Sequence, residues 1–95
     1  MRTYKLTIAY DGTRYQGWQR QPDTELTIQG TLERTIRDLK GVSVEVHGSG
    51  RTDGGVHAEA QTASICLPGK VDEEVFQAEL NRMLPGDIRV TGAKL

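Results

Sequence analysis

The sequence has few of the features that indicate a secreted or membrane-bound protein. Its single cysteine, Cys66, excludes a disulfide within the chain and makes a reducing cytoplasm the simplest setting. No apolar run approaches the ~20 residues that a membrane-spanning helix needs. The first residues enter an alternating pattern instead of the apolar core of a signal peptide. We therefore expect a cytoplasmic protein that has no membrane partner.

An excess of charge is also missing, because the formal net charge is only −1. By itself this value does not indicate a nucleic-acid-binding protein. The charges are unevenly placed, however: residues 1–51 carry eight Lys and Arg against six Asp and Glu, and residues 52–95 carry four against seven. A site for a polyanion should therefore use Arg14, Arg20 and Arg51.

The remaining pattern predicts one α+β domain over residues 1–95. Alternation of apolar and polar residues predicts strands over 3–10, 42–47 and 61–67 and a fourth strand from Ile88. Helical spacing predicts helices over 28–40, capped by Thr27 and stopped by Gly41, and over 73–84, capped by Asp72. We expect Val75, Phe76, Leu80, Met83 and Leu84 to form the buried stripe of the second helix.

This order of elements, β-α-β-β-α-β, is the ferredoxin-like arrangement, an antiparallel sheet with two helices on one face. The other face of the sheet must meet water or a partner. The fold alone does not identify a function, because the same architecture serves many chemistries.

A glycine-rich loop, expected from about Gly48 to Ala60, contains the sequence GSGRTDGGVHA at residues 48–58. Asp53 is its only acid, and Arg51 stands two residues earlier. A guanidinium at that spacing favours an ionised carboxylate, which can act as a nucleophile or a general base. A structural turn in which Arg51 pairs with Asp53 is an equally open interpretation.

Other readings of this loop have less support. The dinucleotide fingerprint lacks its third glycine and the P-loop lacks its lysine. A metal site would need His47, Asp53, His57 and Cys66, which show no paired ligand spacing. A catalytic triad of Ser49, Asp53 and His57 would have to converge within one short loop.

A second polar loop, DGTRYQGWQRQ at residues 11–21, interleaves aromatic, amide and guanidinium groups. Such a mixture suits RNA, because bases stack on aromatic rings and phosphates pair with arginine. Arg14 and Arg20 are the candidate phosphate contacts. Tyr15 and Trp18 could instead anchor the loop to the domain, and burial is the more usual fate of a tryptophan such as Trp18.

Together the two loops closely resemble those of the tRNA pseudouridine synthase A family, and the start of the first helix at Thr27 is similar too. The resemblance places Asp53 on the family's catalytic aspartate and Arg51 on its motif arginine. It implies isomerisation of uridine to pseudouridine in the anticodon stem-loop of tRNA, with no cofactor and no metal. We expect Gly50, Thr52, Gly54 and His57 to contact the substrate.

The family also implies partners beyond tRNA. Its members are usually more than twice as long, with a second domain that completes the active site, and they are expected to form homodimers. We therefore expect this chain alone to be inactive. We also expect its open sheet face to be apolar and the chain to self-associate.

Two other functions are consistent with the fold. A non-enzymatic RNA-binding module would stack bases on aromatic residues of the sheet, but residues 61–67 contain none, and the only Phe, Phe76, is on a helix. A small hydrolase would need a nucleophile paired with a base, and the sequence shows no such pair.

Overall fold

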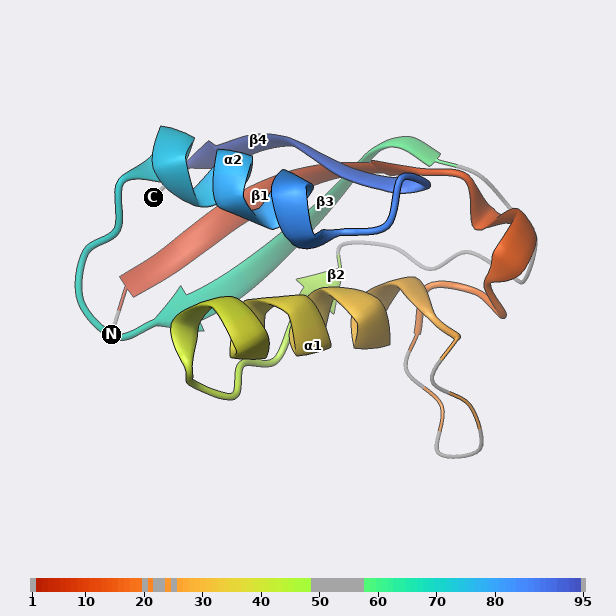
Figure 1. Cartoon of the computed structure of the whole chain (residues 1–95), viewed down its shortest axis with the longest axis horizontal. Helices are drawn as coiled ribbons and strands as arrows, with labels where there is room; N and C mark the ends of the chain where they lie inside the picture. The colour runs from red at the N-terminus through yellow and green to blue at the C-terminus, as the bar shows by residue number, and fades with distance from the viewer. Residues whose placement is uncertain (1, 20, 22–23, 25, 49–57, 95) are drawn as a thin grey trace.

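The computed structural model describes all residues except 1, 20, 22–23, 25, 49–57 and 95. The elements follow one another in the predicted order (Figure 1). They are β1 (Arg2–Tyr10), the short 3₁₀ helix η1 (Gly12–Arg14), α1 (Ile28–Lys40), β2 (His47–Gly48), β3 (Ala58–Leu67), α2 (Glu73–Met83) and β4 (Ile88–Lys94).

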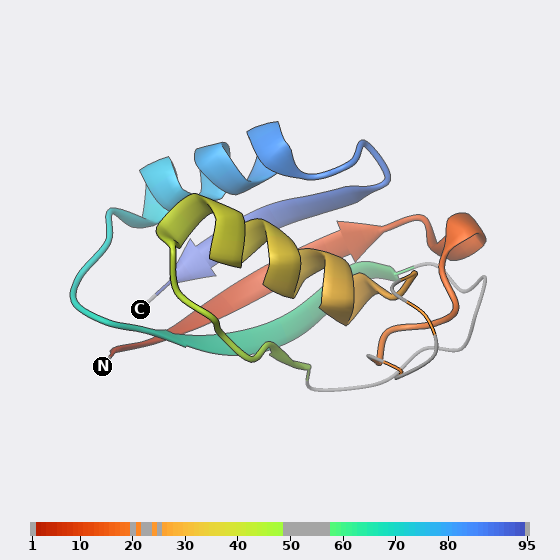
Figure 2. The ribbon, with the colours of Figure 1, turned by 60° about the horizontal axis from the view of Figure 1, so that its bottom comes forward.

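The strands form one antiparallel sheet in the order β2-β3-β1-β4. Both helices lie on the same side of this sheet (Figure 2). The predicted ferredoxin-like α+β fold is therefore confirmed. Because β1 is paired on both sides, its last residue lies beside both neighbouring strands: Tyr10 is opposite Ala58 of β3 and opposite Ile88 of β4.

The core lies between the sheet and the helices. Alternation along β1 buries every second side chain, as predicted. The largest side chains with less than 2% exposure are Tyr4, Leu6, Ile8, Ile28, Leu32, Ile36, Val46, Ile65, Leu67, Phe76, Leu80 and Val90. Apart from Val46, they belong to β1, α1, β3, α2 and β4, so each of these elements is fixed by burial of its own apolar side chains.

The helix boundaries follow the predicted caps. The Thr27 side chain accepts a hydrogen bond from the Gly30 amide at 3.1 Å, and Gly41 ends α1 with φ of 72°. A left-handed residue at this position favours glycine. The Asp72 side chain accepts from the Val75 amide at 3.1 Å at the start of α2. Each N-cap stabilises its helix by about 1 kcal/mol.

The buried stripe predicted for α2 is partly wrong. Phe76, Leu80 and Leu84 are buried, whereas Val75 is 53% exposed and Met83 is 41% exposed. Phe76, Leu80 and Leu84 follow one another at four-residue spacing, and α2 packs against β4 and α1 along this single narrow side. Val75 and Met83 lie outside that side.

The second strand is also shorter than predicted. Residues 42–46 alternate like a strand, but β2 contains only His47 and Gly48. The reason lies in α1: the Gln29 side chain donates to the carbonyl oxygen of Val46 at 2.9 Å, and the Glu33 carboxylate accepts from its amide at 2.9 Å. Both backbone groups of Val46 are therefore bonded to a helix instead of a neighbouring strand.

The third strand is longer than predicted, because it begins at Ala58 instead of Gln61. Ala58 pairs with Tyr10 at the end of the central strand, across a register shift. Pairing to a central strand outweighs the weak strand preference of these residues. The predicted loop from about Gly48 to Ala60 is thereby reduced to the nine residues between β2 and β3.

Candidate functional site

Most of the predicted site lies outside the described residues. This holds for the two candidate catalytic residues, Asp53 and Arg51, and for the candidate substrate contacts Arg20, Gly50, Thr52, Gly54 and His57. Arg14 is described. The structure therefore describes the residues on either side of the glycine-rich loop and most of the second polar loop.

The residues on either side of the glycine-rich loop are held by the loop after β1 and by β1 itself. Gly48 lies against the indole of Trp18 so closely that a Cβ atom there would stand 2.5 Å from Nε1 and 2.6 Å from Cε2. Ala58, at the other end, pairs with Tyr10. The rings of Tyr10 and Trp18 are themselves 6.1 Å apart between centroids. The start of the loop is thus packed on Trp18, and its end is held by strand pairing with the last residue of β1.

Trp18 belongs to the second polar loop and is only 3% exposed, so the expected anchoring role is confirmed. The backbone amide of Gln29 donates to the carbonyl oxygen of Trp18 at 2.9 Å, and the backbone amide of Ile28 donates to that of Gly17 at 3.2 Å. These bonds use two of the amides that the first turn of α1 leaves without helical partners. The loop after β1 is therefore fastened to the start of α1.

The same loop is fastened at its other end by Asp87, which precedes β4. The Asp87 carboxylate accepts from Arg14 Nε at 2.7 Å and from the Tyr15 hydroxyl at 2.8 Å. Its backbone oxygen accepts from the Asp11 amide at 2.9 Å. Asp11 in turn caps η1, since its Oδ1 accepts from the amide of Thr13.

These contacts change the acidities of all three side chains. The hydrogen bond from Arg14 holds the pKa of Asp87 below its ordinary value, and the same pair raises the pKa of Arg14 above its own. Burial, followed by the hydrogen bond to Asp87, raises the pKa of Tyr15 to about 12. At neutral pH the cluster is therefore an ion pair beside a neutral phenol.

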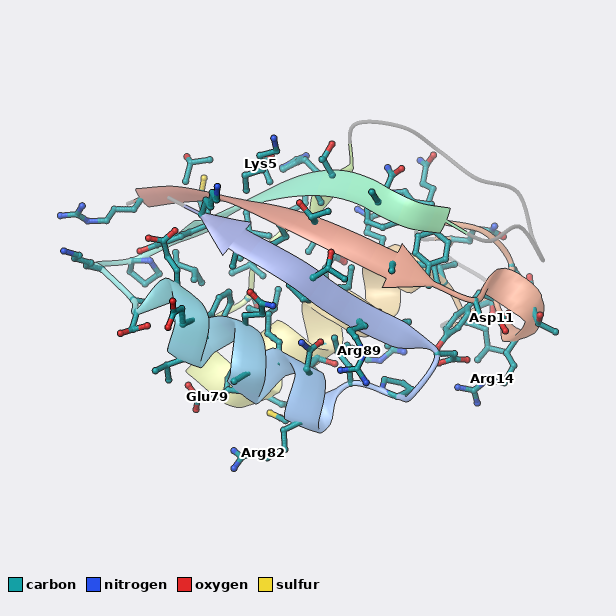
Figure 3. The ribbon with its side chains drawn as sticks, turned by 90° about the horizontal axis from the view of Figure 1, so that it is seen from above. Lys5, Asp11, Arg14, Glu79, Arg82 and Arg89 are labelled. Atoms are coloured by element: carbon teal, nitrogen blue, oxygen red, sulfur yellow. The ribbon has the colours of Figure 1, made fainter. Side chains whose placement is uncertain are left out.

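Arg14 remains available at the surface, because its side chain is 64% exposed whereas that of Asp87 is 18% exposed. Figure 3 shows Arg14 beside η1 at the end of the sheet. Sequence reasoning identified Arg14 but missed Asp87. Asp87 follows the predicted end of the second helix at residue 84, and no local pattern links it to a residue 73 positions earlier.

The open sheet face is polar, so the predicted apolar surface is wrong. The exposed large hydrophobic residues of the described chain are Leu26, Val75 and Met83, and none belongs to a strand. The pairing instead places on this face Thr3, Lys5, Thr7, Ala9, His47, Thr62, Ser64, Cys66 and Lys94. Among these described side chains the charges are positive.

A shallow depression of about 290 Å³ lies on this face. It is lined by Lys5, His47 and Gly48 and by residues 62–64 of β3. Lys5 also stands directly opposite Lys94 of β4. Two like charges at paired positions of a sheet repel one another, and a bound anion would relieve that repulsion.

Over residues 2–48 and 58–94, apart from the few undescribed positions near Pro22, no group of three His, Cys, Asp or Glu is placed to hold a metal ion. Within the same part of the chain, neither helix has the length and apolarity to cross a membrane.

The chain was compared with known proteins. Residues 6–94 match the family described as tRNA pseudouridine synthase. The tRNA pseudouridine synthase A of Caldicellulosiruptor bescii is 50% identical over 93 residues, which are 98% of this chain and 38% of that protein. That of Bacillus sp. (strain KSM-64) is 47% identical over 95 residues, all of this chain and 39% of the relative. The chain thus spans well under half the length of these curated relatives.

Proposed function

The chain belongs to the tRNA pseudouridine synthase family, and we propose that it is the aspartate-bearing domain of an enzyme that isomerises uridine to pseudouridine in the anticodon stem-loop of tRNA. The observation that carries this proposal is the family match over residues 6–94, which includes the whole glycine-rich loop. The coverage of 38–39% of the relatives supports a second domain beyond this one.

The reaction breaks the bond between N1 of uracil and C1′ of the ribose, turns the base and joins C5 to C1′. The proton of C5 is lost to solvent and N1 gains one, so nothing is added to the nucleotide overall. No redox agent or group donor is therefore required. The nucleotide must leave the base stack first, which costs a few kcal/mol.

In this proposal Asp53 is the catalytic carboxylate. Arg51 keeps it ionised or takes the place of the flipped base, and Arg14 and Arg20 contact backbone phosphates. Gly50, Thr52, Gly54 and His57 line the path of the substrate. The proposal draws support from the residues that flank the loop, because Gly48 packs on the Trp18 indole and Ala58 pairs with Tyr10 at the end of β1.

The open sheet face supports tRNA as the partner. Lys5 and Lys94 give it positive charge at opposed positions of β1 and β4, and the nearest acid to its His47 is the Glu45 carboxylate at 3.7 Å. Positive charge along a groove attracts the phosphate backbone. A homodimer in the cytoplasm, as the family implies, completes the proposal.

The test is release of tritium from tRNA labelled at uridine C5. The proteins are this chain alone and a hybrid in which this chain is followed by the part of the Caldicellulosiruptor bescii relative that lies beyond the matched region. We expect the hybrid to release tritium and the chain alone to release none. Asp53→Asn in the hybrid should reduce release to background while tRNA binding persists.

The matched control is Asp38→Asn, the same change at an exposed residue of α1 whose carboxylate is 62% exposed. It should leave tritium release unchanged. Substantial turnover by the Asp53→Asn hybrid would refute the role of Asp53. Binding of tRNA by a folded hybrid without any release would favour the non-enzymatic RNA-binding module instead.

A further inference from the structure

Asp87 fastens three residues of the loop after β1 at once. Its backbone oxygen bonds the Asp11 amide, and its two carboxylate oxygens bond Arg14 and Tyr15 separately. A single residue before β4 therefore determines where the loop lies and in which direction the Arg14 side chain extends from it.

The bond to Arg14 is made through Nε, the nitrogen closest to the backbone. It uses one of the five N–H groups of the guanidinium. Because the group is planar, a bond at Nε fixes the plane in which the outer N–H groups point. The Arg14 side chain nevertheless stays 64% exposed. It also lies over the Tyr15 ring, with Cζ 5.7 Å from the ring centroid.

Charge and geometry make opposite demands on this pair. Asp87 is an anion next to a candidate phosphate contact, so its charge alone should weaken binding of RNA. An arginine held in one orientation, however, loses less conformational entropy when it binds a phosphate. The sign of the effect of Asp87 on RNA binding therefore shows which contribution is larger.

We propose that Asp87 is a positioning residue that holds Arg14 in the orientation in which it contacts the phosphate backbone of the tRNA. The inference rests on the proposed function for its ligand. It goes beyond that function by assigning a role to Asp87, a residue outside both polar loops. It requires that removal of the negative charge of Asp87 weakens RNA binding.

Asp87→Asn is the variant that separates these contributions. Asparagine keeps the size of the side chain and leaves the backbone oxygen that accepts from Asp11 unchanged. Arg14 and Tyr15 donate to different oxygens of Asp87, and asparagine keeps only one oxygen, so one of the two bonds is lost in this geometry. The domain should therefore still fold, and far-ultraviolet circular dichroism verifies this.

Glu79→Gln is the matched control, because it changes the net charge by the same amount. Glu79 is on α2, away from Arg14 (Figure 3). The probe is a fluorescently labelled anticodon stem-loop RNA, and its affinity for the chain and for the hybrid is measured by anisotropy over a range of salt concentrations. Arg14→Ala and the Arg14→Ala, Asp87→Asn double variant complete the set.

We expect Asp87→Asn to weaken binding about two- to fivefold, the range that an exposed ion pair of this kind accounts for. Arg14→Ala should weaken binding at least as much and lower the slope of log affinity against log salt by about 1. The double variant should bind like Arg14→Ala alone. Glu79→Gln should bind as tightly as the unmodified protein or slightly more tightly.

Two outcomes would overturn the inference while the proposed function stands. One is binding by Asp87→Asn that is unchanged or tighter, as charge alone predicts. The other is a loss from Asp87→Asn that persists in full when Arg14 is already alanine. Failure of both the unmodified chain and the hybrid to bind the stem-loop would instead remove the proposed function, and the inference with it.

Discussion

Gly48→Ala tests most directly whether Gly48 packs closely on Trp18 at the start of the glycine-rich loop. The new Cβ atom would lie 2.5, 2.6 and 2.8 Å from three atoms of the Trp18 indole. Carbon atoms in contact are normally about 3.5–4 Å apart. Trp18 is 3% exposed and its ring contacts that of Tyr10, so the indole cannot move aside without disturbing its neighbours.

The expected cost follows from this geometry. Overpacking a well-packed site costs roughly 1–3 kcal/mol. Alanine also stiffens the unfolded chain, which offsets about 0.4–1 kcal/mol of that cost. The net loss of unfolding free energy is then about 1–2 kcal/mol. In a domain of this size, such a loss lowers the melting temperature by roughly 4–16 °C.

The assay is thermal and urea unfolding of the chain, followed by circular dichroism and by tryptophan fluorescence. Trp18 is the only tryptophan, so the emission reports on the contact itself. Gly86→Ala is the matched control, because a Cβ there meets nothing within 4 Å and its φ is not positive. It should leave stability unchanged or raise it by up to about 1 kcal/mol.

The same substitution in a chain that carries Trp18→Phe provides a second test. In a Trp18→Phe chain the smaller ring leaves room for the added methyl group, so Gly48→Ala should cost less there than in the unmodified chain. Coupling of this kind is expected of residues in contact. If Gly48→Ala has the same melting temperature as the Gly86→Ala control and leaves the tryptophan emission unchanged, the close packing of Gly48 on Trp18 is refuted.

Two further predictions concern other parts of the fold. The Asn81 side-chain amide donates to the carbonyl oxygen of Val90 at 2.8 Å and accepts from the Val90 backbone amide at 2.7 Å. Asn81→Ala should therefore lower the free energy of unfolding in urea by about 1–2 kcal/mol and promote self-association through the freed edge of β4. The control Gln77→Ala should do neither. Tyr15 has a pKa of about 12 in the folded chain against 10.0 ordinarily, so its stabilising contribution is complete below pH 10 and is lost as the pH rises towards 12. Urea midpoints measured across that interval should fall more steeply for the unmodified chain than for Tyr15→Phe; parallel curves would contradict the assignment.

The fold was predictable because its main signals are local. Alternation along β1 and the caps at Thr27, Gly41 and Asp72 each depend on residues within a few positions of one another. The second strand was mispredicted because Val46 bonds to Glu33 and Gln29 of α1. No periodicity in residues 42–47 records those partners, which lie 13 and 17 positions earlier.

The candidate site was likewise predictable only where its signals are local. Arg14 was identified from its own loop, because guanidinium and aromatic groups stand together there. Asp87, which orients it, is 73 residues away and is joined to it only by the pairing of β1 with β4. The close approach of Gly48 to Trp18 likewise depends on tertiary packing, although the glycine itself was visible in the motif.

The attachment of Val46 to α1 also divides the preceding connection into two parts of unequal freedom. Between the Gly41 cap and Glu45 the chain is held only by Val42 and Val44, which are partly buried against the core, so added or deleted residues there would disturb little buried structure. From Val46 to Gly48 the spacing is set by the helix on one side and by the Trp18 ring on the other. Length variation between related proteins is therefore tolerable before Val46 and costly after it, where each inserted residue would shift the start of the glycine-rich loop.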